Sequence, residues 1–430
     1  MPQLGRLKEA VRPYYLRWLY FPLRPAQRPN AFRSCWDYPF QRLDPSARLP
    51  VSSSGRPDLL FYPMTDWHMR IQRTQQLVRA FAGLGFRCVY INPHLGREFE
   101  STPLFDRAHR LTKLEKNIFE LHIRLPQEPV FHDRLLSTAE EEIISAAVRQ
   151  VLPEQGKAVQ ILSFPLWLGV ARGFQSASSW PMVYDCHDLL SGFQNISPDV
   201  ISAEADLMRQ ADLVLFSSAG LRDRSPEVRR SLLVRNAVEH AHFDAVSPVQ
   251  KRGSPVAGYV GALDTWFDMD AVEQAAQQNP QCHFVIAGRI EFDPIRRLKS
   301  LPNLEFLGEV PYDQVPGLLK SLDAALIPFC INPLTLMTNP VKLYEYFSCG
   351  LPVVSTALPE AEAMGDLIYI GRSGREFGQQ LSCALSEADP SRRNRRRELA
   401  QRESWTARAR VITQVLDEID PFPHFPQIEP

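Results

Sequence analysis

The sequence has neither a dominant charge nor a known phosphate-binding loop. Its 48 Lys and Arg residues nearly balance its 49 Asp and Glu residues, so the net charge gives no reason to expect a nucleic-acid partner. Neither Gly-x-x-x-x-Gly-Lys-Ser/Thr nor Gly-x-Gly-x-x-Gly occurs in the chain. These absences exclude the P-loop nucleotidases and the dinucleotide-binding fingerprint from the candidate functions.

Closely spaced cysteines and long apolar runs are missing as well. The seven cysteines are dispersed without a Cys-x-x-Cys pair, which argues against a disulfide framework or a zinc site and for a reducing compartment. No apolar run approaches the roughly 18 residues of a membrane span, and the N-terminus lacks the apolar region of a signal peptide. We therefore expect a cytoplasmic protein.

The patterns that are present predict two α/β domains. With 430 residues the chain exceeds one typical core, and 44% hydrophobic residues suit a globular protein. Two series of alternating strand and helix patterns are separated by residues 246–255, where Pro, Gly, Ser and charge occur together. The predicted segments are an N-terminal extension (1–50), a first domain (51–247), a linker (248–255), a second domain (256–402), a final helix (403–420) and a tail (421–430).

The first domain opens with a strand, helix and strand pattern. Residues 58–64 and 87–93 read as buried strands, and apolar residues recur at helical spacing between them until Gly85. Such a βαβ unit makes its two strands parallel. Asp66, Trp67 and His68 follow the first strand and so lie at the carboxyl edge of the sheet, where ligands bind. A helix N-cap is the alternative role for Asp66.

The rest of this domain continues the alternation. The pattern of residues 119–124 does not assign them to a helix or a strand. A helix is expected over 139–150, and strands are expected over 159–165, 180–189 and 213–218. Polar residues end the strand at 180–189, because Asp185, His187 and Asp188 leave an apolar run and enter a loop. A histidine in this place is as compatible with a structural role as with a catalytic one.

Glycines and an arginine follow strands of the second domain. Strands are expected over 256–263, 283–290, 304–308 and 324–329. Gly261 follows the first, where bare backbone lets a phosphate approach, and Gly288-Arg289 end the second. The Arg289 guanidinium suits a bidentate phosphate contact. Each of these signals is also compatible with an ordinary turn.

The most informative stretch runs from Asn339 to Thr356. Pro340 suits a first helical turn, and Lys342 and Glu345 are three residues apart and share one helix face. Gly350 ends the helix and a short apolar strand follows. A helix beginning at the carboxyl edge of a parallel sheet directs its N-terminus at a ligand, so Lys342 is placed for a phosphate and Glu345 for ribose hydroxyls. The alternative is a surface Lys/Glu pair.

This stretch, read as Pro-x-Lys-x-x-Glu-Tyr-x-x-x-Gly-x-Pro-Val-Val, resembles the donor-binding signature of family-4 glycosyltransferases, which have the GT-B fold of two Rossmann-like doubly wound domains facing a cleft. The order of elements over residues 256–356 is similar to the donor domain of that family. Residues 1–255 match only in outline, although residues 232–243 resemble the segment that closes the first domain. The final helix resembles one that crosses back onto the first domain.

The resemblance implies roles for particular residues. Glu345 holds the ribose of a nucleotide sugar, and Lys342, Arg289, Gly261 and Asn339 complete the donor site. The groups implied to border the transferred sugar and to act in catalysis are His187, Asp188 and Asp66. The acceptor side comprises Trp67, His68, Arg70 and Asp185.

The implied activity is a retaining, metal-independent transfer of a sugar to a hydroxyl of a glycan or glycolipid, as in cell-surface polysaccharide synthesis. No cofactor or metal is implied beyond the nucleotide-sugar substrate. Two alternatives remain: a non-catalytic subunit that binds a nucleotide sugar or a partner transferase, and a sugar-nucleotide epimerase of the same fold. The sequence departs from the family pattern at Met337, where an earlier Glu is common, and in residues 63–68, which replace a glycine-rich loop.

Two basic segments raise the question of membrane contact. Residues 11–22 interleave arginines with aromatic residues, which suits either a membrane interface or an extension packed on its own domain. Residues 391–398 are rich in arginine on a predicted helix, which suits either a solvated helix face or anionic lipid headgroups. A peripheral position at the inner face of a membrane is therefore possible for an otherwise cytoplasmic protein.

Overall fold

The computed structural model describes residues 41–42, 48–50, 52, 55–67, 71–92, 109–123, 125, 131–153, 156–193, 195–225, 228–245 and 253–419. Contacts divide the chain into two compact units. Unit 1 comprises residues 1–184, 195–213 and 415–430, and unit 2 comprises residues 185–194 and 214–414. Most of the N-terminal extension, most of the predicted linker and the whole tail lie outside the described residues, so their boundaries remain predictions.

A nine-stranded sheet begins in unit 1 and has the order β1-β4-β5-β3-β2-β6-β7-β8-β9. Six of its strands, taken in chain order, lie in the order 3-2-1-4-5-6 typical of a Rossmann fold, and β2 is parallel to both β3 and β6. The antiparallel strand β4 extends one edge. The strands are β1 (Gln41–Arg42), β2 (Asp58–Tyr62), β3 (Cys88–Ile91), β4 (His109–Glu115), β5 (Ile118–Ile123), β6 (Ala158–Leu162), β7 (Met182–Cys186), β8 (Leu213–Phe216) and β9 (Ser231–Leu233).

The helices between these strands begin at recognisable caps. The Ser137 hydroxyl accepts from the Glu140 amide while the Glu140 carboxylate accepts from the Ser137 amide, a capping box. Ser197 caps the next long helix, which has Pro198 in its first turn. The helices are α4 (Arg73–Gly83), α5 (Thr138–Val151), η4 (Pro165–Trp167), α6 (Leu168–Ser178), η5 (Leu190–Gly192), α7 (Pro198–Gln210), α8 (Ala219–Arg224) and α9 (His240–Asp244).

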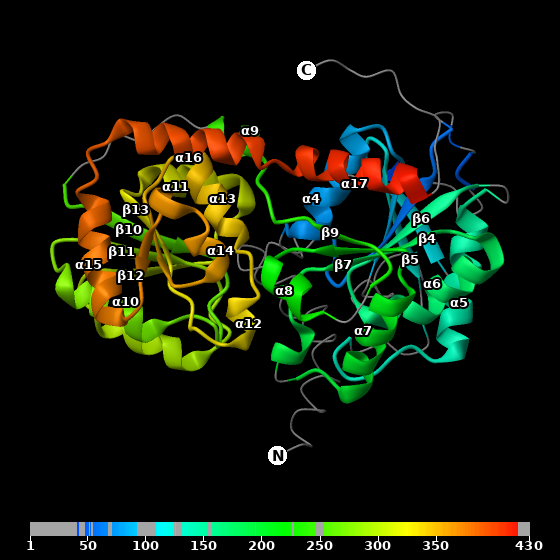
Figure 1. Cartoon of the computed structure of the whole chain (residues 1–430), viewed down its shortest axis with the longest axis horizontal. Helices are drawn as coiled ribbons and strands as arrows, with labels where there is room; N and C mark the ends of the chain where they lie inside the picture. The colour runs from blue at the N-terminus through cyan, green and yellow to red at the C-terminus, as the bar shows by residue number, and fades with distance from the viewer. Residues whose placement is uncertain are drawn as a thin grey trace. The chain divides into compact units, whose positions relative to one another are not determined.

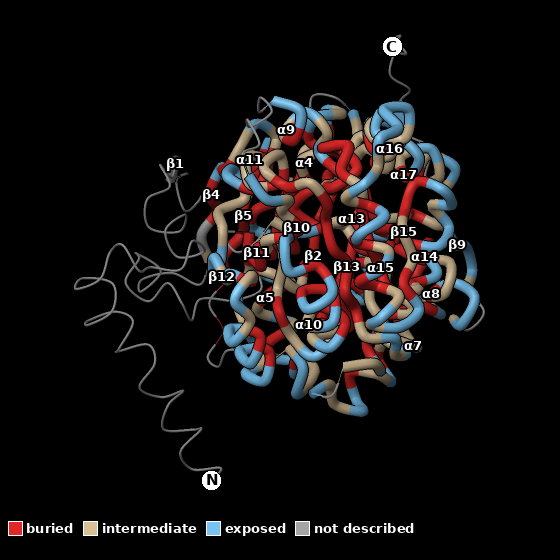
Figure 2. The backbone as a smooth tube through the Cα atoms, turned by 90° about the vertical axis from the view of Figure 1, so that its left-hand side faces the viewer, coloured by how far each residue is buried: buried red, intermediate tan, exposed pale blue. Residues whose placement is uncertain are grey.

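The six-stranded sheet of unit 2 repeats the same topology. Its order is β12-β11-β10-β13-β14-β15, again 3-2-1-4-5-6 in chain order, and the strand pairs are parallel. The tube in Figure 2 is red along β13, all of whose residues are buried. The strands are β10 (Val256–Val260), β11 (His283–Ala287), β12 (Leu304–Gly308), β13 (Ala324–Ile327), β14 (Val353–Thr356) and β15 (Tyr369–Gly371).

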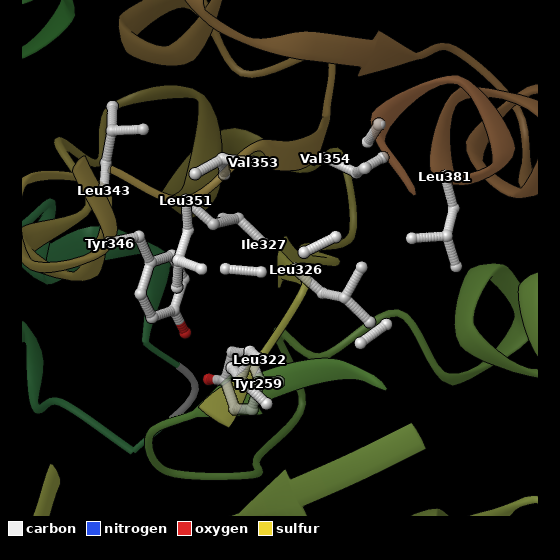
Figure 3. Close-up of a cluster of buried hydrophobic side chains, with 14 of the residues drawn as sticks. Tyr259, Leu322, Leu326, Ile327, Leu343, Tyr346, Leu351, Val353, Val354 and Leu381 are labelled. Atoms are coloured by element: carbon white, nitrogen blue, oxygen red, sulfur yellow. The ribbon is translucent and has the colours of Figure 1, made fainter. Parts of the chain in front are cut away.

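Helices cover both faces of this sheet (Figure 1). Helix α10 packs against α15, and α13 packs against α16. Leu343 and Tyr346 of α13 lie beside Leu351 and Val353 in the core (Figure 3). The helices are α10 (Met269–Gln278), η6 (Asp293–Ser300), η7 (Tyr312–Gln314), α11 (Val315–Ser321), α12 (Pro333–Leu336), α13 (Val341–Ser348), α14 (Pro359–Glu362), η8 (Gly365–Leu367), α15 (Gly374–Leu385), α16 (Pro390–Arg402) and α17 (Trp405–Ile419).

The arginine-rich helix α16 is held to its own unit by several of its arginines. Arg396 is fully buried, and its guanidinium donates to both carboxylate oxygens of Glu387 at 2.6 Å. Arg395 makes a bidentate pair with Asp366. The helix is therefore not a wholly solvated face, because these arginines bind neighbouring segments, and its contact with lipid headgroups stays a prediction. In the described part of the chain, no helix combines the length and apolar character that crossing a membrane requires.

Most predicted elements of both sheets are confirmed. The predicted parallel pairing of β2 and β3 is present, and the ambiguous residues 119–124 fall on β5, whose strand ends at Ile123. The sequence interpretation missed β4, which is antiparallel to β5 and half exposed in places, so it lacks the continuous apolar run of a central strand. The edge strand β15 and helix α15 were also not predicted.

Candidate functional site

The strand order of unit 2 places a ligand edge beside β10 and β13. These two strands are neighbours at the point where the order reverses, and ligands of open α/β sheets bind outside the carboxyl ends of such strands. Gly261 follows β10 directly, and Phe329 follows β13 after one proline. Helix α13 begins soon afterwards, at Val341. The predicted donor residues therefore include groups at the topological switch point.

Two glycines pack against each other at this edge. Gly261 and Gly288 both have φ of 154°, a conformation that other residues rarely adopt. A Cβ atom on Gly288 would collide with the carbonyl oxygen of Gly261. The Gly261 amide donates to Ala287 O at 2.9 Å, so the ends of β10 and β11 continue side by side beyond the strands. Bare backbone is thus required at both predicted positions.

Helix α13 has a defined start, buried face and end. Pro340 is its N-cap, and Leu343, Tyr344, Tyr346 and Phe347 are buried. Gly350, with φ of 72°, closes a Schellman motif in which the Leu351 amide donates to Tyr346 O at 3.1 Å. The Tyr346 hydroxyl also accepts from the Val260 amide at 3.0 Å. The helix is therefore fixed to the end of β10.

Lys342 projects from the first turn of α13 toward Gly261. Its ammonium lies 5.2 Å from the ring centroids of Tyr259 and Phe329. A Cβ atom on Gly261 would lie 3.0 Å from this ammonium. Burial lowers the pKa of Lys342 to about 8, an effect that the carboxylate of Glu345 partly opposes.

Glu345 lies one turn further along the same helix. Burial raises the pKa of its carboxyl group to about 7, and the charge of Lys342 opposes the rise. Both side chains are only half-buried by exposed area, so they remain accessible. Among the described residues, neither the ammonium of Lys342 nor the carboxylate of Glu345 has a hydrogen-bond partner. A charged pair of this kind is stabilised by a polar ligand.

Arg289 is the least constrained of the predicted donor residues. It follows Gly288 at the predicted edge, and its carbonyl accepts from the Leu263 amide at 3.0 Å. Its side chain is 55% exposed, and Nε pairs with Glu291 at 2.9 Å. The structure therefore places Arg289 beside the two glycines but pairs it with a carboxylate.

Asn339 has a positioning role in place of the ligand contact that the resemblance implied. The side chain is 1% exposed, and its Oδ1 accepts from the Asn236 amide at 2.9 Å. Its Nδ2 donates to Tyr344 at 3.1 Å and to Glu360 at 2.9 Å. Each polar atom of the amide is thus occupied within the protein, which leaves it unsuited to contact a ligand.

The polar residues that follow β7 form a local cluster. His187 Nδ1 lies 2.9 Å from Asp185 O, which requires a proton on Nδ1, and Nε2 lies 3.7 Å from Asp188 Oδ2. Ser217 Oγ donates to the carbonyl of His187 at 3.0 Å. Asp185 is buried, whereas the side chains of His187 and Asp188 are partly exposed. The structure brings the predicted His187 and Asp188 together, and Asp185, whose carbonyl contacts His187, is buried.

The predicted residues after β2 are mostly structural. Asp66 is 2% exposed and accepts from Asn92 Nδ2 at 3.0 Å. Trp67 is buried in edge contact with Tyr90, and the Arg79 guanidinium lies 5.0 Å from its ring. The Trp67 ring thus packs inside its own unit, and its place on the acceptor side stays a prediction. His68 and Arg70 lie outside the described residues.

Three site residues were not predicted. Tyr259 and Phe329 flank the ammonium of Lys342, and Glu360 binds Asn339. The aromatic pair could have been found from the strand order, since both residues lie at the ends of the strands that border the switch point. Glu360 gave no such signal, because its partners are distant in sequence.

The described residues contain no group of three or more His, Cys, Asp and Glu side chains arranged to hold a metal ion. The two carboxylates of the pattern Asp268-Met-Asp270 have structural partners and do not converge on a metal site. Asp268 caps α10 by accepting from the Ala271 amide at 2.9 Å, and Asp270 pairs with Arg297.

Comparisons with known proteins bear on the family and the fold. Residues 254–386 match the family described as Glycosyl transferases group 1. TuaH of Bacillus subtilis strain 168, provisionally named a teichuronic acid biosynthesis glycosyltransferase, is 28% identical over 273 residues, which cover 55% of this chain and 67% of TuaH.

Solved structures extend the likeness to most of the chain. Sucrose-phosphate synthase from Thermosynechococcus elongatus superposes with a TM-score of 0.65 at 16% identity, covering 85% of this chain and 99% of that one. HepE of Anabaena, solved in complex with UDP and glucose, gives a TM-score of 0.58 at 15% identity and covers 84% and 100%. The match over residues 254–386, the glycosyltransferase relative and the two Rossmann-like sheets together support a glycosyltransferase with the GT-B fold, similar in its second domain to the group 1 enzymes.

Proposed function

We propose that this enzyme transfers a sugar from a uridine diphosphate sugar to a hydroxyl group of a glycan or glycolipid. In this proposal the transfer retains the anomeric configuration, needs no metal ion and serves cell-surface polysaccharide synthesis. Lys342 and Glu345 bind the donor, and His187 and Asp188 border the transferred sugar.

One observation carries the proposal: two oppositely charged side chains at the switch point have no hydrogen-bond partner in the described protein. A nucleoside diphosphate supplies what each needs. Its diphosphate offers anionic oxygens to the Lys342 ammonium, and its ribose offers two hydroxyl donors to the Glu345 carboxylate. The bare backbone at Gly261 leaves room for the diphosphate beside the ammonium.

The reaction requires stabilisation of a leaving group more than proton transfer to it. Negative charge accumulates on the diphosphate as its bond to the sugar breaks, and an ammonium already held beside it lowers the energy of that state. The first amides of α13 add a favourable dipole at the same place, since the first N–H groups of a helix lack partners within the helix. Aromatic rings beside Lys342 exclude water and strengthen the attraction.

The relatives support the choice of donor and acceptor class. HepE was solved with UDP and glucose, and TuaH is named for synthesis of teichuronic acid. HepE supports a UDP-linked donor, and TuaH supports an acceptor in polysaccharide synthesis. Retention and metal independence rest on the family resemblance.

Calorimetric titration with UDP and UMP tests the donor site. We expect wild-type protein to bind UDP more tightly than UMP, because only UDP presents a β-phosphate to Lys342. Lys342→Met should weaken UDP binding about 10-fold or more, the scale of one lost hydrogen bond to a charged group. Lys299→Met is the matched control, since Lys299 is an exposed lysine of the same unit. Equal UDP affinity in Lys342→Met and wild type would contradict the proposal.

Turnover separates a transferase from the alternatives. Release of UDP from a UDP-sugar in the presence of polysaccharide fragments is expected of a transferase, and it should persist after treatment with EDTA. Tight UDP-sugar binding without UDP release would indicate a binding subunit. Conversion of one UDP-sugar into another would indicate an epimerase.

A further inference from the structure

Glu360 joins three separate segments of unit 2 at the start of α13. Its side chain is 4% exposed, and Oε1 accepts from the Ala219 amide at 2.9 Å. Oε2 accepts from Arg235 Nε at 2.7 Å and from Asn339 Nδ2 at 2.9 Å. A single carboxylate thus satisfies a helix N-terminus, a guanidinium and the residue that precedes Pro340.

Asn339 connects Glu360 to the start of helix α13. Its amide cannot rotate without placing a donor against a donor, because Glu360 requires Nδ2 and the Asn236 amide requires Oδ1. Asn236 Nδ2 also donates to the backbone carbonyl of Asn339 at 2.6 Å. The residue before the N-cap Pro340 is therefore held on both its side chain and its backbone.

A second set of contacts fixes the other side of the same junction. Arg408 of α17 donates from Nε to the carbonyl of Arg235 at 2.9 Å and from Nη2 to the carbonyl of Asn236 at 3.2 Å. Residues 235–236 are consequently held between α17 and Asn339. Lys342 lies three residues beyond Asn339, so any shift in this junction moves its ammonium relative to Gly261.

We propose that Glu360 is a positioning residue for the donor site, which acts through Asn339 to fix the start of α13 and thereby the place of Lys342. This inference rests on the proposed function only for its effect on UDP affinity. The ordering of α13 itself is independent of any ligand.

The substitution Glu360→Gln tests this role with almost no change in size. A glutamine presents one N–H₂ group, which must face a donor whether it lies toward Ala219 or toward Arg235 and Asn339. We expect faster amide hydrogen exchange in peptides covering α13 and UDP affinity about 10-fold weaker, the scale of one lost hydrogen bond to a charged group. Arg235→Gln, at a side chain 35% exposed, should show the same changes to a smaller degree.

Two control variants separate positioning from general loss of stability. Glu362→Gln removes a carboxylate from the same helix α14 that pairs with the exposed Arg372. Glu140→Gln removes a buried carboxylate of unit 1 that binds Arg134. Both should leave the exchange of α13 and the UDP affinity unchanged, even if Glu140→Gln lowers the unfolding temperature.

Unchanged exchange of α13 in both Glu360→Gln and Arg235→Gln would overturn the inference, and so would equal increases in the two controls. Failure of wild-type protein to bind UDP would instead count against the proposed function. In that case the hydrogen-exchange comparison still decides whether Glu360 positions the helix.

Discussion

The titration of Lys342 gives the sharpest test of the donor site. Burial holds the pKa of its ammonium at about 8, so ligand-free protein loses this charge between pH 7.5 and pH 9. About three quarters of the molecules carry the charge at pH 7.5, and about one tenth carry it at pH 9. Because the diphosphate binds the charged form, the affinity for UDP should fall about eightfold across this interval.

Glu345 limits the affinity on the acid side. Burial raises the pKa of its carboxyl group to about 7, and a protonated carboxyl group loses part of its capacity to accept from two ribose hydroxyls. Affinity should therefore decrease again below pH 7. The expected profile has its maximum near pH 7.5, where each of the two charges is present in about three quarters of the molecules.

Isothermal titration calorimetry at constant ionic strength measures this profile. The matched comparison is Lys342→Met, in which the decrease between pH 7.5 and pH 9 should disappear. The variant also controls for titration of the nucleotide itself, which is common to both proteins. The assignment of Lys342 to the diphosphate would be refuted if the UDP affinity of the wild-type protein stayed constant between pH 7.5 and pH 9. It would also be refuted if Lys342→Met retained the decrease.

Three further predictions concern the same unit. Gly261→Ala should weaken UDP binding about 10-fold or more by calorimetry, because its Cβ would displace the Lys342 ammonium; unchanged affinity would contradict this. Ligand-free Lys342→Met should unfold at the wild-type temperature or higher in thermal scans. The pKa of this lysine is lower in the folded protein than its unfolded value of 10.5, so its charge destabilises the fold at pH 7. The free energy of unfolding of the wild-type protein should therefore rise as the pH increases above about 8. A lower unfolding temperature in Lys342→Met than in the wild type would count against this. Arg396→Leu should cost about 1.5–3 kcal/mol in urea unfolding, because Glu387 loses its hydrogen bonds from a charged guanidinium and keeps only Arg392 and Tyr369; a loss under about 0.5 kcal/mol would exclude this.

The strands and the donor motif could be predicted because their signals are local. Short apolar runs such as β13 and β14 are recognisable in a few residues, and Gly350 after the apolar face of α13 marks where that helix ends. The sequence also indicated that Gly261 and Lys342 lie at the same edge, since both follow strands of one parallel sheet. The structure places the two residues close together, and their shared role at the donor stays a prediction.

The roles of several polar residues could not be predicted, because their partners are remote. Asn339 binds Asn236, which is 103 positions away, and Glu360 binds Arg235, which is 125 positions away. A single sequence carries no signal of such pairings, whereas the helix and strand periods are visible in it. The same reason explains why the arginines of α16 were interpreted as a surface feature.

The buried and partly buried charges of unit 2 fall into two groups, and the difference between them supports a ligand site. Arg396 and Glu360 are more deeply buried than Lys342, yet each makes hydrogen bonds that compensate for its loss of water. Lys342 and Glu345 have no such bonds among the described residues, and the pKa of each is displaced toward its neutral form. A partly buried charge without a hydrogen bond from the protein reduces stability, because it has lost part of its water without compensation. A nucleotide that binds both groups would remove the penalty, so the free energy that the ligand-free fold loses at this pair becomes part of the affinity for the donor.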